Sequence, residues 1–334
     1  MFSFYLFIFL LNFFIFILYK KISRLYNLFD YPDNNRKIHK EPIPLFGGLF
    51  LISNLFFILI YLNFSNSSID LYFFENRNNY NFFFLITFLF FLIGFFDDKY
   101  QINYKIKFIL YTILIILTFY LDNDLLIKKL EFSFFKSVID LGFYSYIFTI
   151  LCFLLFINAY NMLDGINGQA TCYVLFIFFL LVTKNILVPF ISVLFVCLLF
   201  FLILNFQNKS FLGDNGALPL GYIVSYIFIK IYNTNKLFLA DEIFLIMAIP
   251  GYELLRLAIK RVLNKNHPFL PDNNHIHHLI GKKYKFIVTF FIIQFVLIFP
   301  YLLYILSSQF FFSFFISLFL YTLCIIYFYK ISKS

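Results

Sequence analysis

The chain has 334 residues, of which 62% are hydrophobic and 25% aromatic, whereas only 13% are charged. Soluble domains carry about 25% charged residues, so this composition excludes an ordinary soluble enzyme and indicates a membrane protein. The formal net charge of +9 does not require a nucleic-acid partner, because Lys and Arg also gather in loops that flank membrane helices.

Eleven apolar runs are long enough to be candidate membrane helices. They cover residues 2–19, 47–63, 81–96, 106–121, 144–158, 169–183, 187–206, 217–232, 242–258, 286–306 and 310–329. The chain has no repeat with the period of a repeat protein and no low-complexity linker. We therefore expect one all-α integral membrane domain over residues 1–334, a multi-pass helical bundle.

Eleven spans place the two termini on opposite sides of the membrane. Of the 26 Lys and Arg residues, 19 fall on the side that holds loops 20–46, 97–105, 159–168, 207–216 and 259–285 and the C-terminal tail. The positive-inside rule makes this side cytoplasmic. All five histidines lie on it, as do the aspartates at positions 97, 98, 164 and 214, so we expect a cytoplasmic active site.

The first polar segment, RKIHKEPIPLFGG, precedes the second span. Its basic residues, such as Arg36, would be attracted to anionic lipid head groups. His39 is not needed for that attraction, so a shaped anion site is the alternative.

Two adjacent carboxylates, Asp97 and Asp98, end the third span in the segment GFFDDKY. Adjacent carboxylates repel, which favours a bound cation or a raised proton affinity on one of the two. Hard oxygen ligands suit Mg²⁺, which also shares phosphate oxygens. The alternative is a solvated helix end.

The segment NAYNMLDGINGQA follows the fifth span. Asn158, Asn161 and Asp164 are spaced by three, so a helix end would place them on one face. An ordinary turn of Asn, Asp and Gly is the alternative, but polar groups at membrane depth are costly and often functional.

In the segment FLGDNGALPLG, Asp214 stands at the start of the eighth span. A helix N-terminus favours anions, so a carboxylate there can bind a metal while the N–H groups bind phosphate. A plain N-cap is the alternative reading.

Three of the five histidines, His275, His277 and His278, lie within the segment HPFLPDNNHIHH. A histidine cluster suggests a metal site, a phosphate site or a proton relay. Membrane di-iron enzymes carry more histidines, and a zinc site lacks a nearby cysteine here. Imidazoles beside basic residues are better suited to phosphate oxygens. The alternative is a surface loop that is rich in histidine.

Taken in order from Arg36 to His278, these five segments resemble the polyprenyl-phosphate N-acetylhexosamine-1-phosphate transferases, glycosyltransferase family 4. The loop PFLPDNNHIHHLI is similar to that of bacterial enzymes that start O-antigen, enterobacterial common antigen or wall teichoic acid. The resemblance implies transfer of the sugar 1-phosphate from a UDP-N-acetylhexosamine to polyprenyl (undecaprenyl) phosphate, with release of UMP. The reaction would occur at the cytoplasmic face of the bacterial inner membrane, would start a cell-envelope glycan, and would need Mg²⁺, for which Mn²⁺ can substitute.

The resemblance also implies roles for single residues. Asp214 would bind Mg²⁺ together with Asp97, and Asp97 and Asp98 would be catalytic. Asp97 is the proposed base, although a phosphate monoester is largely ionised at cytoplasmic pH and needs none. The histidines at 275, 277 and 278 would contact the diphosphate or the sugar, and Phe211 would stack on uracil. The other positions implied to bind substrate are Arg36, His39, Asn158, Asn161, Asp164, Asn167 and Arg261.

The ninth span, AIPGYELLRLAIKR, resembles the family's broken helix, with Pro250–Gly251 supplying the break. Three positions depart from the family pattern. Asn167 stands where an Asp is frequent, Gln101 stands where the peptidoglycan branch has a basic residue, and Glu253 replaces the usual Asp. These departures leave the identity of the sugar open.

Two other functions would also fit a chain with many helices. A transporter should show inverted repeats and polar groups near the midplane, neither of which is evident. A Mg²⁺-dependent prenyltransferase should carry two Asp-rich helical motifs and would not explain the histidine cluster. A non-catalytic membrane protein is the third alternative. Expected partners are the two substrates and membrane lipid, without nucleic acid, and the resemblance allows a homodimer.

Overall fold

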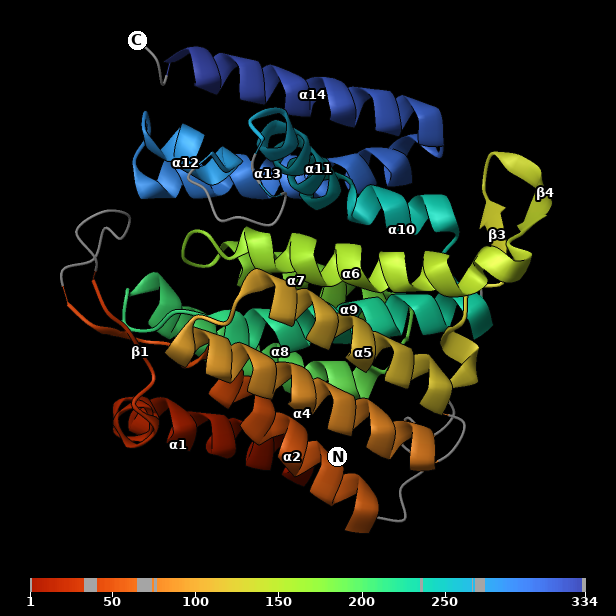
Figure 1. Cartoon of the computed structure of the whole chain (residues 1–334). Helices are drawn as coiled ribbons and strands as arrows, with labels where there is room; N and C mark the ends of the chain where they lie inside the picture. Colours follow the sequence, from red (N-terminus) through yellow and green to blue (C-terminus); the bar gives the residue numbers. More distant parts are fainter. Residues whose placement is uncertain are drawn as a thin grey trace. The chain divides into compact units, whose positions relative to one another are not determined.

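The computed structural model describes residues 2–32, 41–64, 74, 77–234, 237–265, 267 and 274–331. Arg36 and His39, two of the expected substrate-binding residues, lie outside the described residues. The described ranges are mostly helical, which confirms the prediction of an all-α membrane protein (Figure 1).

The chain divides into two compact units, each made of two separate stretches of sequence. The first unit contains Met1–Asn123 and Val174–Ile223, and the second contains Asp124–Tyr173 and Val224–Ser334. Helices α7 (Gln169–Thr183) and α9 (Asp214–Thr234) contribute residues to both units.

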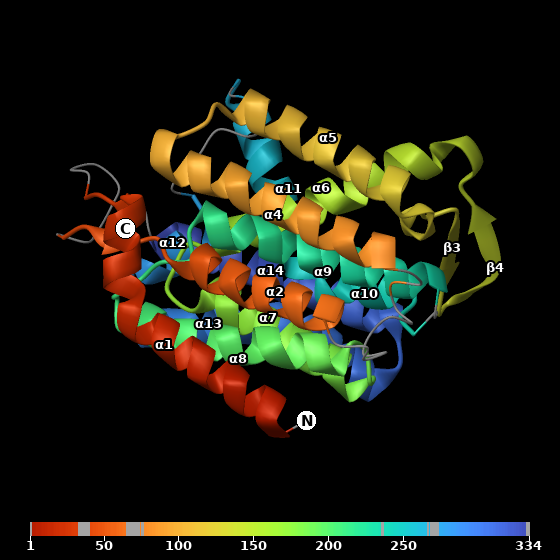
Figure 2. The ribbon, with the colours of Figure 1, turned by 90° about the horizontal axis from the view of Figure 1, so that it is seen from below.

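The helices of the first unit follow the apolar runs, because a helix satisfies every backbone polar group within one segment. They are α1 (Phe2–Tyr26), α2 (Gly47–Phe64), α4 (Arg77–Tyr100), α5 (Tyr104–Leu121) and α8 (Val188–Phe206). A short antiparallel pair, β1 (Phe29–Asp30) and β2 (Ile43–Pro44), sets Phe29 opposite Pro44. Helices α4 and α5 lie side by side in Figures 1 and 2, so the C-terminal end of α4 lies near the N-terminal end of α5.

A pair of buried amides joins α1 to α2. The Asn12 Nδ2 donates to Asn54 Oδ1 at 2.8 Å, and the Asn54 Nδ2 donates back to Asn12 Oδ1 at 2.9 Å. Neither side chain is exposed. Such reciprocal bonds contribute about 1 kcal/mol to helix association in a membrane and fix the register of the two helices.

The second unit contains a hairpin and most of the C-terminal helices. Its elements are β3 (Lys129–Phe132), β4 (Phe135–Asp140), η2 (Gly142–Tyr144), α6 (Ser145–Leu163), α10 (Ala240–Ile246), α11 (Ala248–Leu263), α12 (Ile276–Gly281), α13 (Phe286–Ser307) and α14 (Phe310–Ile331). A single turn, η1 (Asn123–Leu125), precedes the hairpin. Helix α6 packs on α11, and the short helix α12 packs on both α13 and α14.

The ninth predicted span is broken, but not at the expected place. Helix α10 ends before Met247 and α11 begins directly after it, so the break lies at Met247 rather than at Pro250–Gly251. Pro250 and Gly251 lie in the first turn of α11. Proline is tolerated there because the first N–H groups of a helix have no partner within it, so the expected location of the break was wrong by a few residues.

Each of the eleven predicted spans coincides with a helix, the ninth with the pair α10 and α11. Within the described ranges, eight helices are long and apolar enough to cross a membrane. Helix α7 is apolar but has only 15 residues. A multi-pass membrane protein is therefore shown, and the count of eleven stays a prediction.

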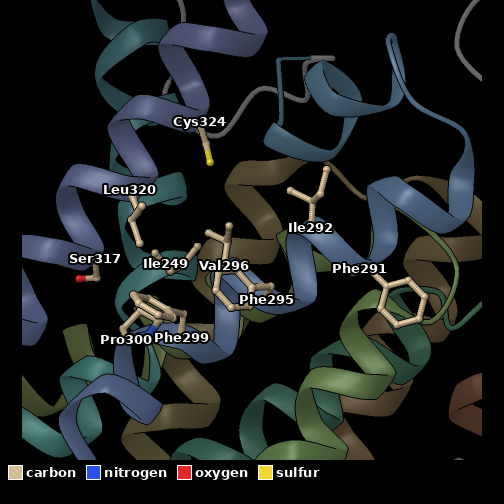
Figure 3. Close-up of a pocket in the computed structure, with 10 residues that line it drawn as sticks. All are labelled: Ile249, Phe291, Ile292, Phe295, Val296, Phe299, Pro300, Ser317, Leu320 and Cys324. Carbon is tan, nitrogen blue, oxygen red and sulfur yellow. The ribbon is translucent and has the colours of Figure 1, made fainter. Parts of the chain in front are cut away.

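A cavity of about 360 Å³ lies among α11, α13 and α14 in the second unit (Figure 3). Its lining has no carboxylate, imidazole or cationic group, so it offers nothing for phosphate chemistry. The lining residues are Ile249, Phe291, Ile292, Phe295, Val296, Phe299, Pro300, Ser317, Leu320 and Cys324.

Candidate active site

The three aspartates that the sequence singled out come together in the first unit. Asp97 and Asp98 lie in the last turn of α4, and Asp214 is the first residue of α9. They are separated by more than a hundred residues of sequence and are joined by hydrogen bonds and by one shared cation. The fold therefore brings two of the five sequence segments into one cluster.

Asp98 caps the N-terminus of α9. Its Oδ1 accepts the N–H of Asp214 at 3.0 Å, and its Oδ2 accepts the N–H of Asn215 at 2.9 Å. The Asn215 side-chain amide also donates to Asp98 Oδ2, at 2.5 Å. A carboxylate is well suited to this place, because the first N–H groups of a helix lack partners and the helix dipole favours negative charge.

Asp97 and Asp214 share the ammonium group of Lys107, a residue of α5. The Lys107 Nζ lies 3.1 Å from Asp214 Oδ2 and also contacts Asp97 Oδ2. The other oxygen of Asp97 accepts the N–H of Ile102 at 2.7 Å. Sequence analysis did not single out Lys107, because it lies inside an apolar run and belongs to none of the quoted segments.

Two glycines allow the helices to approach this closely. A methyl group on Gly94, one turn before Asp97, would overlap the backbone of Asp214. Gly213 has a φ of +70°, a left-handed conformation that glycine adopts at little cost, and a Cβ there would meet Asp98 Oδ2 at 2.7 Å. The close contact between α4 and α9 therefore depends on both residues.

The loop after β2 is attached to the same cluster. The N–H of Phe211 donates to Pro44 O at 2.9 Å, and the N–H of Phe46 donates to Phe211 O at 3.1 Å. Asn215, which is fully buried, accepts the N–H of Gly48 at 2.7 Å and thereby ties the start of α2, directly after this loop, to α9. Phe211, the expected uracil-stacking residue, thus sits on a fixed backbone segment within the first unit.

The donor set fits a hard divalent cation. Oxygens of Asp97 and Asp214 already converge on one cationic atom, and their side chains are only 10% and 24% exposed. In the described part of the chain, no group of three or more His, Cys, Asp or Glu side chains is arranged to enclose a metal. Magnesium does not need such a cage, since it is commonly bound by one or two carboxylates, waters and substrate phosphates.

The histidines form a second cluster, in the second unit. The rings of His275 and His277 are nearly parallel with centroids 5.2 Å apart, and the centroids of His277 and His278 are 4.3 Å apart. His275 is the N-cap residue of α12, and the other two lie within this helix.

The histidine cluster contacts the segment that follows α6. A methyl group on Gly165 would overlap the imidazole of His277, so the turn and α12 are in direct contact. Asn158 and Asn161 lie within α6, where the Asn158 amide donates to Leu154 O at 2.7 Å. Asp164 is the C-cap of α6 rather than part of it. The structure therefore brings two further sequence segments together, with Asn167 in the same turn.

Burial determines the charge of the central histidine. His277 is 4% exposed, and burial lowers its pKa well below the ordinary value of 6.5. His278 and His275 lower it further, because a second positive charge nearby is unfavourable. His277 is therefore neutral at neutral pH and offers one nitrogen donor and one acceptor.

Arg261, another expected substrate-binding residue, lies in the last turn of α11 and is 9% exposed. Glu253 and Arg256, on the same helix, contact the backbone around His275. Sequence analysis noted Glu253 only as a departure from the family pattern and did not select Arg256, because the partners of both residues lie in another segment.

Several known proteins are similar to this chain in sequence. Residues 80–232 match the sequence model of glycosyl transferase family 4. A "probable undecaprenyl-phosphate N-acetylglucosaminyl 1-phosphate transferase" of Bacillus subtilis (strain 168) is 27% identical over 270 residues, which are 78% of this chain and 71% of that protein. Two proteins named undecaprenyl-phosphate alpha-N-acetylglucosaminyl 1-phosphate transferase are also similar. The one from Escherichia coli (strain K12) is 24% identical over 274 residues, which are 78% of this chain and 71% of that protein. The one from Thermotoga maritima is 27% identical over 170 residues, which are 50% of this chain and 54% of that protein. The chain is therefore similar to glycosyl transferase family 4, over residues 80–232.

Proposed function

We propose that the chain transfers an N-acetylhexosamine 1-phosphate from a UDP-linked sugar to undecaprenyl phosphate and releases UMP. A phosphate oxygen of the lipid attacks the β-phosphorus of the nucleotide sugar. The bond between that phosphorus and the oxygen bridging to UMP breaks, and UMP leaves with the electron pair. The names of the similar proteins support the lipid acceptor and the transfer of a sugar 1-phosphate, which gives a lipid diphosphate-linked sugar beside UMP.

The observation that carries this proposal is the convergence of Asp97 and Asp214 on one cation at adjoining helix ends. Both substrates are polyanions, so their approach requires positive charge at the reacting phosphates. Asp97 and Asp214 would hold Mg²⁺, with Mn²⁺ as a substitute, and a bound divalent ion would neutralise charge on the phosphate oxygens. Lys107 would then turn from the carboxylates to a phosphate oxygen.

The other expected residues would bind either the nucleotide or the diphosphate and sugar of the donor. Phe211 would stack on uracil, and the histidines at 275, 277 and 278 would donate hydrogen bonds to the diphosphate or the sugar. Asp98, which was also expected to be catalytic, would act through Asp214, because it accepts hydrogen bonds from the N-terminus of α9. The remaining proposed substrate contacts are Arg36, His39, Asn158, Asn161, Asp164, Asn167 and Arg261.

We place this reaction at the cytoplasmic face of the bacterial inner membrane, where the nucleotide sugar is available and basic loops gather. The lipid-linked sugar would start a cell-envelope glycan, and the histidine loop is similar to that of enzymes that start O-antigen, enterobacterial common antigen or wall teichoic acid.

The test is nucleotide release by the purified chain. Undecaprenyl phosphate, Mg²⁺ and a panel of UDP-GlcNAc, UDP-GalNAc and UDP-glucose are supplied in turn. We expect UMP from at least one UDP-N-acetylhexosamine, only when lipid and Mg²⁺ are both present. EDTA should abolish release and a zinc-selective chelator should not. No UMP from any donor would refute the proposal.

A further inference from the structure

Glu253 is a buried acid in the middle of α11, 4% exposed. One of its oxygens, Oε1, accepts the N–H of Ile276 at 2.8 Å. Ile276 is the first residue of α12, so the carboxylate of one helix caps the N-terminus of another.

Arg256, one turn further along α11, completes the arrangement. Its Nη2 donates to Glu253 Oε1 at 2.8 Å and its Nε donates to Glu253 Oε2 at 3.0 Å. The same Nη2 donates to Asn274 O at 2.7 Å. The acid–base pair therefore presents one acceptor and one donor to the backbone of a neighbouring segment.

The two backbone groups that the pair binds lie on either side of His275: the carbonyl of Asn274 and the N–H of Ile276. The His275 Nδ1 also lies 3.9 Å from Glu253 Oε1. Helix α12 has six residues, too few to be stable by itself, so its orientation depends on contacts from outside.

A purely structural role is the alternative, because Tyr321 on α14 is bonded to the same pair. Its hydroxyl donates to Glu253 Oε2 at 2.5 Å and accepts from Arg256 Nε at 3.0 Å. If the pair only joined α11 to α14, the Tyr321 bonds would suffice and the backbone of the histidine segment would not need binding. The two roles therefore predict different effects of substitution at Glu253 and at Tyr321.

We infer that Glu253 and Arg256 form a positioning clamp that fixes the backbone on both sides of His275 and so orients this imidazole toward the substrate. The inference rests on the proposed function only in assigning His275 to the diphosphate or the sugar of the donor. Neither clamp residue touches the substrate; both act through His275.

The first test does not depend on activity. Diethyl pyrocarbonate acylates imidazole nitrogens, and mass spectrometry measures its rate at each histidine. His275 is 13% exposed, whereas His267 is exposed and serves as the internal reference. Glu253→Gln should raise the His275 rate relative to His267 by about threefold or more, because the released segment opens locally. Tyr321→Phe, the matched control, keeps both backbone bonds and should leave that ratio within about twofold.

The second test is a kinetic cycle with His275→Ala. Misplacing a group by about 1 Å can cost about 10²-fold in rate, so Glu253→Gln should lower kcat at least about tenfold while KM changes little. In the His275→Ala background, Glu253→Gln should cause no further loss, because coupled residues are not additive. Arg256→Lys retains the charge but loses the two-pronged guanidinium and should behave as Glu253→Gln does.

Unchanged His275 labelling in both clamp variants, or losses that simply multiply in the double variant, would overturn the clamp. If Glu253→Gln does not fold, the labelling test and the kinetic cycle are both made with Arg256→Lys. A wild-type protein that releases no UMP from any UDP-sugar would refute the proposed function instead, and the labelling ratio would still decide on the clamp.

Discussion

Asp97, Asp98 and Asp214 are the same residue type, but their neighbours differ. Asp98 accepts three hydrogen bonds from the start of α9, whereas Asp97 and Asp214 face the ammonium of Lys107. We therefore expect Asp97 and Asp214 to act in the reaction and Asp98 to stabilise the start of α9.

Amide substitutions should separate these roles. Asp97→Asn and Asp214→Asn keep the shape and remove the charge, so we expect at least about a 10²-fold loss of UMP release, with little change in melting temperature. Asp98→Asn removes an anionic cap, so we expect a loss of about 1–2 kcal/mol in stability as well as lower activity. Unfolding is followed with a thiol-reactive dye, since Cys197 is fully buried. Near-native turnover by Asp214→Asn would move the metal role to another acid.

His277 should make stability depend on pH. Its folded pKa lies below the unfolded value of about 6.5, so between these two values the unfolded chain binds more protons. Stability should be constant above about pH 6.5 and should fall below it, by up to about 1.4 kcal/mol per pH unit. His277→Gln should flatten this acid slope in melting curves from pH 7.5 to 5. An equally steep slope in the variant would show that another group titrates.

The sequence predicted which acidic and histidine residues are functional candidates, but not all the residues that bind to them in the fold. Asp97, Asp98 and Asp214 were found because they are acids where apolar runs end. Lys107 was missed because a lysine inside an apolar run has no local partner, and its acids are brought to it only by packing. Glu253 was noticed as a departure from a family pattern, but its bond to Ile276 depends on how α11 and α12 meet.

At the scale of elements, apolar runs predicted each helix, because length and hydropathy alone determine what can span a membrane. They did not predict the break at Met247. Proline usually breaks a helix, so Pro250 suggested a break at its own position, but Pro250 lies in the first turn of α11. They also missed the hairpin of β3 and β4, whose strands are short and only partly apolar.

The contact between α4 and α9 can be tested through one glycine. Gly94→Ala places a methyl group against the backbone of Asp214, so the two helices must separate. We expect a loss of about 1–3 kcal/mol in stability and a larger loss of UMP release, because Asp97 and Asp214 move apart. Gly251→Ala is the control, since a Cβ there meets nothing within 4 Å and its φ is not positive. Equal effects of the two substitutions would contradict this role for Gly94.

For the whole molecule, the distribution of basic residues predicts the orientation in the membrane. Only seven Lys and Arg residues fall on the side predicted to be external: Arg77, Lys128, Lys129, Lys136, Lys184, Lys230 and Lys236. The two exposed loops at the ends of α8 should therefore face opposite sides, with Asn185 outside and Asn208 inside.

This orientation can be tested with single cysteines, each introduced into a variant in which the four native cysteines have been replaced. In intact cells, an impermeant maleimide should label Asn185→Cys, and it should label Asn208→Cys only after the membrane is opened. The reverse pattern would place the aspartate cluster on the outer face, where no nucleotide sugar reaches it, and the proposed reaction would fail there.

The fate of the β-phosphate tests the central claim most directly. UDP-GlcNAc labelled with ³²P at the β-phosphate is incubated with the purified chain, undecaprenyl phosphate and Mg²⁺, and the products are partitioned between organic solvent and water. Sugar-1-phosphate transfer moves the label into the lipid phase and leaves unlabelled UMP in the water, in equal amounts. A sugar transferred without its phosphate would leave the label in the water as UDP, and that result would contradict the account.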